Sequence, residues 1–320
     1  MFNKVRFSQS GLTLIELMIA MVLGLVLLLG VTNFFLGQRQ AYRVNENLAR
    51  MQDSARTAFE LMAREIREAG GNPCGTPNVD NVVPGFAAST WLNWDVGGLE
   101  GFGGGDPLPG TSFGEDVGQR VAGTDALIVR SGSLNNGLII TEHTPGTSRL
   151  KVNTVAHGIS EGVVLMACDY SKATIFQVTD DLDGTDTIEY GGALSQFARN
   201  GFLTRLSATA WYIGNNTRGG RSLFRHVFTE GASQEIAEGV ADMDLAYLLR
   251  VLENPESRYM NAADVKLKVV ANTWADPATR VVAVRVVLDL ESRDLVGTDA
   301  ATLKRQLVHV VSLRHREIVE

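Results

Sequence analysis

Near its N-terminus the chain carries a long apolar run, residues 12–36, in which the one ionisable side chain is Glu16. As an α-helix rising about 1.5 Å per residue, these residues would extend roughly 37 Å, enough to cross the hydrocarbon core of a bilayer. Such a segment does not fold into a water-soluble core. The sequence therefore predicts a transmembrane helix over residues 12–36, with the remaining residues forming a domain outside the membrane.

The residues before this run predict how the chain is processed and oriented. Residues 1–11 are polar and include Lys4 and Arg6. An ordinary secretory signal places its cleavage site after the apolar region, whereas here the small residue Gly11 comes before it. We therefore expect a leader over residues 1–11, a cut after Gly11, and retention of the helix. By the positive-inside rule, the chain after about residue 37 faces the periplasm.

Glu16 requires an explanation, because a carboxylate within a membrane helix costs roughly 2.5–3.5 kcal/mol on insertion scales. In one interpretation its side chain reaches the lipid headgroups. In the other, it pairs with the α-amino group that cleavage creates at Leu12 of a neighbouring subunit, so that each charge satisfies the other only after assembly. The second interpretation makes Glu16 an assembly switch.

The segment Gly11-Leu12-Thr13-Leu14-Ile15-Glu16-Leu17-Met18 resembles the class III (prepilin) signal of type IV pilins and pseudopilins. The resemblance implies cleavage between Gly11 and Leu12 by a prepilin peptidase, N-methylation of Leu12, and a role for Glu16 in subunit docking. Leu12 stands where phenylalanine or methionine is more usual, and the run lacks the proline common in the middle of major-pilin helices.

The helical pattern continues beyond residue 36 as an amphipathic segment over residues 37–71. Its apolar positions recur at steps of three and four residues: Ala41, Val44, Leu48, Met51, Ala55, Ala58, Met62 and Ile66. The glycines at 70 and 71 and Pro73 end the pattern. A dimeric coiled coil would explain the spacing, but the large domain that follows favours packing of the stripe on the chain itself.

Residues 72–320 predict a β-rich globular domain, with a glycine- and proline-rich irregular insertion at about residues 75–123. Strand-like runs lie at residues 126–130, 138–141, 163–169, 174–178, 203–213, 223–228, 281–290 and 307–313. One further helix is expected near residues 262–272. Helices and strands do not alternate, so we expect an α+β fold with the long N-terminal helix packed on a mainly antiparallel sheet.

Several stretches resemble the large minor pilins of the PilW type and their secretion-system counterparts of the GspJ type. They are residues 64–71, Cys168 with residues 172–178, residues 283–286 and residues 313–316. The length of the chain favours the PilW-type pilins. This resemblance implies a minor subunit that primes or caps a type IV pilus, in contact through its N-terminal helix with other minor pilins and the major pilin. The assembly platform and a tip adhesin are further implied partners.

Composition limits the remaining partners. The formal charge is −7, and loss of Lys4 and Arg6 with the leader gives −9, so direct nucleic-acid binding is not expected.

The two cysteines, Cys74 and Cys168, predict one disulfide in an oxidising compartment, with two free thiols as the alternative. Such a bridge would stabilise the fold by about 4–5 kcal/mol on the chain-entropy model.

No motif predicts catalysis or a cofactor. Asp181, Asp183 and Asp186 form a weak calcium candidate, but the spacing of an EF-hand is missing and an Asp-Gly turn explains the cluster equally well. Residues 110–114 match G-x-S-x-G, yet they follow a glycine- and proline-rich stretch where no strand-to-helix elbow is expected. The histidines show no metal-ligand spacing; they are His143, His157, His226, His309 and His315.

Three aromatic side chains, Trp91, Trp94 and Phe102, would be candidate contacts for a tip partner if exposed, although packing within the domain is the better interpretation.

From the signal and the resemblance together, we expect a non-enzymatic minor pilin that spans the inner membrane once before it enters the pilus, supporting twitching, adhesion or DNA uptake. The alternatives are a GspJ-like pseudopilin of a type II secretion system, and a membrane-anchored periplasmic enzyme or binding module.

Overall fold

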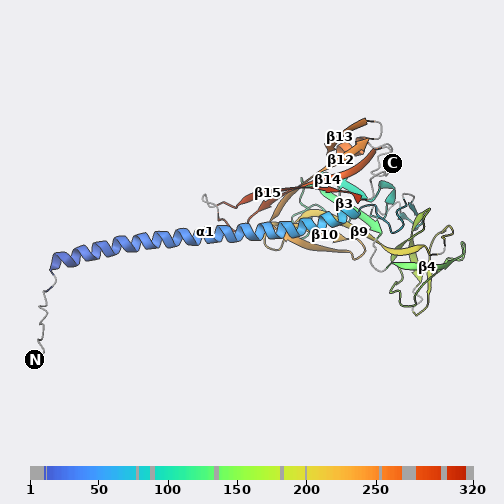
Figure 1. Ribbon diagram of the computed structural model, residues 1–320, viewed down its shortest axis with the longest axis horizontal. Helices are drawn as coiled ribbons and strands as arrows, with labels where there is room; N and C mark the ends of the chain where they lie inside the picture. The colour runs from blue at the N-terminus through green and yellow to red at the C-terminus, as the bar shows by residue number, and fades with distance from the viewer. Residues whose placement is uncertain are drawn as a thin grey trace, which may run out of the picture.

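The computed structural model describes residues 11, 13–76, 79–86, 91–132, 137–180, 184–198, 200–251, 254–268, 279–296 and 301–314. It consists of one very long helix whose C-terminal half lies against a β-rich domain, while its N-terminal half extends away from that domain (Figure 1). This arrangement confirms the α+β expectation.

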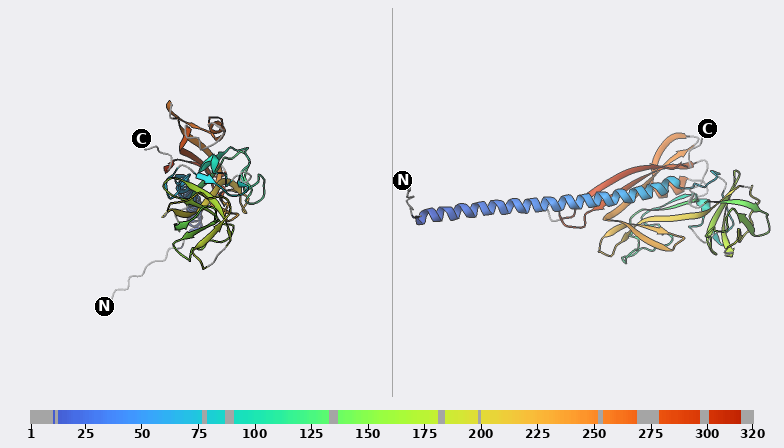
Figure 2. Two further views of the ribbon diagram at one scale, coloured as in Figure 1. Left: turned by 90° about the vertical axis from the view of Figure 1, so that its right-hand side faces the viewer. Right: turned by 60° about the horizontal axis from the view of Figure 1, so that its bottom comes forward.

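Helix α1 spans Leu14–Glu68 without a break and is therefore about 80 Å long. Its first half is exposed except at Gly24, which is partly covered, and its second half turns one face to the domain (Figure 2). The buried residues are Met51, Ala55, Ala58, Phe59, Met62, Ala63 and Ile66. The apolar stripe thus packs on its own chain, as predicted, and Ala41 at the start of the stripe stays exposed.

The C-terminal end of α1 is fixed against the domain by two glycines. Gly70 has a left-handed φ of 73°, and its backbone N–H donates to the carbonyl oxygen of Arg130 at 2.9 Å. Gly98 passes so close that a Cβ on it would lie 2.0 Å from the backbone nitrogen of Gly70. A side chain at Gly98 would push the helix end away from the sheet.

The larger sheet has eleven strands, eight of which follow the order β1-β7-β8-β5-β4-β9-β10-β11. Off this path, β3 pairs with β9 and with β2, and β6 pairs with both β7 and β9. The strands are β1 Val79–Asn81, β2 Leu99–Phe102, β3 Ala126–Gly132, β4 Leu138–His143, β5 Arg149–Val152, β6 Val164–Cys168, β7 Ala173–Asp180, β8 Thr187–Tyr190, β9 Phe202–Asn215, β10 Arg221–Val227 and β11 Ala232–Glu238. Every pair among these described strands is antiparallel except β1 with β7.

The smaller sheet has four antiparallel strands in the order β13-β12-β14-β15. These are β12 Val240–Val251, β13 Asn254–Met260, β14 Thr279–Glu291 and β15 Lys304–Ser312, and the short helix α2, Ala262–Lys268, follows β13. One face of this sheet packs on α1 and shares its core. His309 of β15, for example, stacks on Phe59 with ring centroids 3.9 Å apart.

All eight predicted runs coincide with strands, whereas β1, β2, β5, β8, β11, β12 and β13 were not among them. The predicted helix at 262–272 is present as α2 up to Lys268, and residues 269–272 lie outside the described part of the chain. The expectation that residues 75–123 form an irregular insertion needs correction. This segment supplies β1 and β2 and a 3-10 turn, Trp94–Val96, and it buries Leu99 and Leu108.

The three aromatic side chains of that segment pack within the domain. Trp94 and Phe102 are buried, at 8% and 7% exposure. Trp91 is partly buried and stacks on Phe228, with ring centroids 5.7 Å apart. The alternative in which these residues form an exposed contact surface is therefore wrong.

Candidate functional site: the N-terminal assembly segment

Helix α1 begins with a capping box formed by Thr13 and Glu16. The backbone N–H of Thr13 donates to Oε2 of Glu16 at 2.9 Å, and the hydroxyl of Thr13 donates to the same oxygen at 2.9 Å. The backbone N–H of Glu16 in turn donates to the Thr13 hydroxyl oxygen at 3.4 Å. This reciprocal arrangement satisfies two donors at the start of the helix and fixes the Glu16 carboxylate beside residue 13.

Glu16 was expected to have no partner within its own chain, and the capping box corrects this expectation. Thr13 supplies that partner before any assembly takes place. Thr13 could have been predicted as this partner from the sequence, because T-x-x-E ahead of an apolar run is the pattern of a capping box. Leu12, whose α-amino group cleavage would free, lies outside the described residues, but it directly precedes Thr13 in sequence.

The apolar surface of α1 has no partner within the chain. Its large side chains between residues 14 and 36 are almost all exposed, from 48% at Leu17 to 78% at Leu14. This part of the helix is long and apolar enough to cross a membrane. So large an apolar surface needs lipid or neighbouring helices to cover it.

Glu65 anchors the other half of α1 to the larger sheet. Its Oε2 accepts hydrogen bonds from the Thr209 hydroxyl at 2.6 Å and from the indole N–H of Trp211 at 2.7 Å. Its Oε1 accepts from the guanidinium of Arg225 at 2.7 Å. One carboxylate thus ties the helix to β9 and β10, and nothing in the spacing of the sequence pointed to it.

The disulfide predicted from composition is present between Cys74 and Cys168. Cys74 lies in the loop that leaves α1, and Cys168 is the last residue of β6. The two cysteines are 94 residues apart in sequence, so on the chain-entropy model the bridge stabilises the fold by about 4–5 kcal/mol. It links the C-terminal end of α1 to the distal part of the larger sheet.

Two members of the calcium candidate, Asp181 and Asp183, lie outside the described residues. Asp186 is partly buried, and its Oδ1 accepts a hydrogen bond from the Thr187 hydroxyl at 3.1 Å. The segment joins β7 to its antiparallel neighbour β8, which is the position that the Asp-Gly turn interpretation gives it.

A different acidic cluster lies on the exposed face of the smaller sheet, where Asp242 and Asp244 of β12 face Asp289 of β14. Oxygen atoms of the three carboxylates lie within 4.8 Å of one another. Partial desolvation, followed by the charges of Asp242 and Asp289, raises the pKa of Asp244, although this residue is exposed. The cluster was not predicted, because its members come from strands far apart in sequence.

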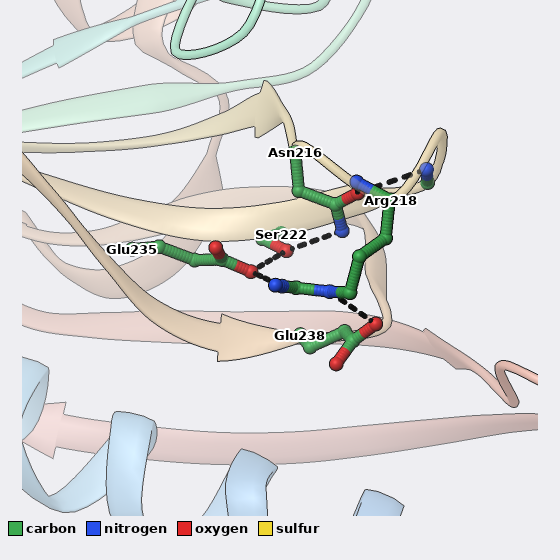
Figure 3. A network of polar contacts seen from close by, with 6 residues as sticks. Asn216, Arg218, Ser222, Glu235 and Glu238 are labelled. Atoms are coloured by element: carbon green, nitrogen blue, oxygen red, sulfur yellow. Dashed lines mark hydrogen bonds and ion pairs between the residues drawn. The ribbon is translucent and has the colours of Figure 1, made fainter.

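The hairpin between β9 and β10 carries a polar network (Figure 3). The guanidinium of Arg218 lies between Glu235 and Glu238 of β11 and forms ion pairs with both. Ser222 donates to Glu235 at 2.7 Å, and Asn216 donates to Ser222 at 2.9 Å. Because each charge has an opposite neighbour, the network holds the hairpin to β11.

The G-x-S-x-G match lies in the loop between β2 and β3, where Ser112 is exposed. The described histidines have local contacts. The ring of His143 hydrogen bonds to the Tyr190 hydroxyl at 2.8 Å, and that of His226 to Ser233 at 2.9 Å. His157 accepts from the backbone of Ile159 at 3.1 Å, and His315 lies outside the described residues.

Comparison with known proteins decides the nature of the N-terminal segment. A family model described as the prokaryotic N-terminal methylation motif matches residues 6–32. The chain is type IV pilin-like at its N-terminus. This class III signal implies processing by a prepilin peptidase and assembly into a pilus or pseudopilus, and with α1 it fits anchoring in the inner membrane. No curated protein and no solved structure matches this chain.

Proposed function

We propose that this pilin-like protein is a minor subunit that primes or caps a type IV pilus. The observation that carries the proposal is the methylation motif at residues 6–32 on an exposed apolar helix that is continuous with a large β-rich domain. The helix supplies affinity for neighbouring subunits, and the domain supplies selectivity. A GspJ-like pseudopilin shares this physical plan and differs in the machine that it serves.

In this proposal the prepilin peptidase cuts between Gly11 and Leu12, and Leu12 is then N-methylated. The capping box holds the Glu16 carboxylate beside Thr13, on the outside of the helix, where it is exposed. The α-amino group of Leu12 in a neighbouring subunit is the countercharge that assembly brings to it. Pairing of the two opposite charges on assembly offsets the cost of burying either charge alone.

The structure separates the two roles of Glu16 experimentally. Glu16→Gln keeps a capping-box residue but loses the charge, whereas Thr13→Ala loses the cap and keeps the charge. We expect the leader to be cleaved in both variants, and incorporation into filaments to fall strongly in Glu16→Gln and little in Thr13→Ala. The measurement is the ratio of subunit in sheared filaments to subunit in the membrane.

Glu60→Ala is the matched control, because Glu60 is an exposed helical carboxylate paired with Arg56. Wild-type incorporation of Glu16→Gln would contradict the charge-pairing role. A loss in Thr13→Ala as large as that in Glu16→Gln would show that the cap matters for incorporation as much as the charge does. Enrichment in sheared surface filaments supports the pilus, while confinement to the envelope together with a defect in protein export supports the pseudopilus.

A further inference from the structure

The connection between β14 and β15 touches α1 where the helix leaves its apolar segment. We call residues 292–296 the membrane-proximal loop. The side-chain amide of Gln40 donates to the carbonyl oxygen of Val296 at 2.8 Å, and that of Asn47 donates to Asp294 at 3.2 Å. Figures 1 and 2 both show this end of the smaller sheet reaching farthest along α1 toward the N-terminus.

Internal hydrogen bonds give the membrane-proximal loop a defined shape. The backbone N–H of Ser292 donates to the carbonyl oxygen of Leu303 at 2.9 Å, and the Leu303 N–H donates to the Ser292 hydroxyl oxygen at 2.7 Å. Ser292 and Val296 are buried, at 5% and 1% exposure, whereas Leu295 between them is 66% exposed. The loop therefore presents Leu295 from a fixed base.

The helix gives the height of this loop relative to a bilayer. Gln40 lies four residues beyond Leu36, the last residue of the apolar run, which is about 6 Å along the helix axis. A bilayer of about 40–45 Å with a hydrocarbon core of about 30 Å has a headgroup layer of roughly 5–7 Å on each side. Val296, bonded to Gln40, therefore lies at the level of the headgroups, and Leu295 is its neighbour.

The charges around the loop suit a lipid surface. Arg39 and Arg43 of α1 and Arg293 of the loop are exposed, and within the described part of the chain none of the three forms an ion pair. Arg39 lies about 4–5 Å beyond Leu36 along the helix axis and Arg43 about 10 Å, while Arg293 lies beside Asn47 and Arg50, farther from the apolar run. Cations near an anionic lipid surface are attracted to its phosphates.

We infer that the membrane-proximal loop docks on the lipid headgroup layer, with Leu295 inserted among the headgroups and Arg39 of the neighbouring helix at the level of the phosphates. A single exposed leucine is ordinary on a protein surface; here its rigid base and its height just beyond the apolar run point to lipid. The contact gives the unassembled subunit a second membrane attachment beside α1. It fixes the tilt of the domain until the subunit leaves the bilayer.

The test uses one introduced thiol in the full chain. The only two cysteines are joined in the disulfide, so Leu295→Cys adds the single site for an environment-sensitive fluorophore. The labelled protein is placed in nanodiscs of phosphatidylethanolamine and phosphatidylglycerol, with and without a lipid that carries a quencher at the top of its acyl chains. We expect blue-shifted emission at position 295 and loss of most of it with the quenching lipid.

Two control positions make the outcomes distinct. Val155→Cys has a similarly exposed aliphatic side chain, at 57%, in the distal part of the domain, and should not be quenched. Val26→Cys, within the apolar run, reports membrane insertion of α1 itself. Quenching at 26 with none at 295 would overturn the inference while leaving the anchored helix intact, and no quenching at either position would overturn both. Gln40→Ala should reduce the quenching at 295, because it releases the loop from the helix.

Discussion

At the scale of single residues, Glu65 shows how the domain is held to its helix. Its carboxylate satisfies three donors from β9 and β10, including the indole N–H of Trp211, whose side chain is fully buried. Buried donors that lose their acceptor cost free energy because they cannot recover a bond to water. The contact lies outside the assembly segment, so stability and assembly can be tested separately.

Glu65→Ala is therefore expected to lower the free energy of unfolding by about 2–4 kcal/mol, mainly through the unsatisfied Trp211 and Arg225. Urea unfolding of the detergent-solubilised chain, followed by tryptophan fluorescence, measures the change. Glu60→Ala, which removes an exposed carboxylate from the same helix, should change it by less than about 0.5 kcal/mol. Equal effects of the two substitutions would contradict the anchoring role.

The same scale explains why some site residues were predictable and others were not. Gly11, Leu12 and Glu16 lie within one short local motif, so their spacing was readable from the sequence. The capping partner Thr13 was equally local and was overlooked. Glu65 and the Asp242, Asp244 and Asp289 cluster depend on contacts between distant segments, which no single-sequence spacing encodes.

At the scale of elements, the sequence predicted α1 closely because its stripe repeats over many turns and ends in glycine. The strands β9, β14 and β15 were found as β-branched or aromatic runs. Strand β12 was missed although its buried residues alternate: Met243, Leu245, Tyr247 and Leu249. The outward positions between them include Asp242 and Asp244, residues that strands disfavour. Strand β13 contains Pro255 and forms a sheet edge, where proline is tolerated.

The exposed face of the smaller sheet gives a prediction about pH. The pKa of Asp244 is raised above its ordinary 3.8 by partial desolvation and by the charges of Asp242 and Asp289. The folded state therefore holds this proton more tightly than the unfolded chain, so its contribution to stability is greatest at low pH and is lost as pH rises through the folded-state pKa. At pH 7 the Asp244 carboxylate opposes folding.

Asp244→Asn should consequently raise the Tm at pH 7, and the difference from wild type should shrink as the pH approaches 4. Thermal unfolding at both pH values, with EDTA present to exclude bound cations, measures this. Asp53→Asn removes an exposed carboxylate from α1 and serves as the control. A lower Tm of Asp244→Asn at pH 7 would show that the carboxylate makes a favourable contact instead.

At the scale of the whole molecule, the protein is an extended helix with a domain at one end (Figure 1). The two halves of α1 have different partners. The buried half is fixed by the core, by Glu65 and by the bridge from Cys74 to Cys168, while the exposed half is left for lipid or for neighbouring subunits. Because α1 is one continuous helix, a force or a displacement of its exposed half within a filament is transmitted directly to the domain.

The central claim, that this chain is a processed filament subunit, is tested most directly by mass spectrometry of the N-terminal peptide from sheared surface filaments. The account predicts a peptide that begins at Leu12 and carries one N-methyl group, enriched in the filament fraction. A peptide that still begins at Met1, or absence of the protein from every filament preparation while it remains in the membrane, would contradict it.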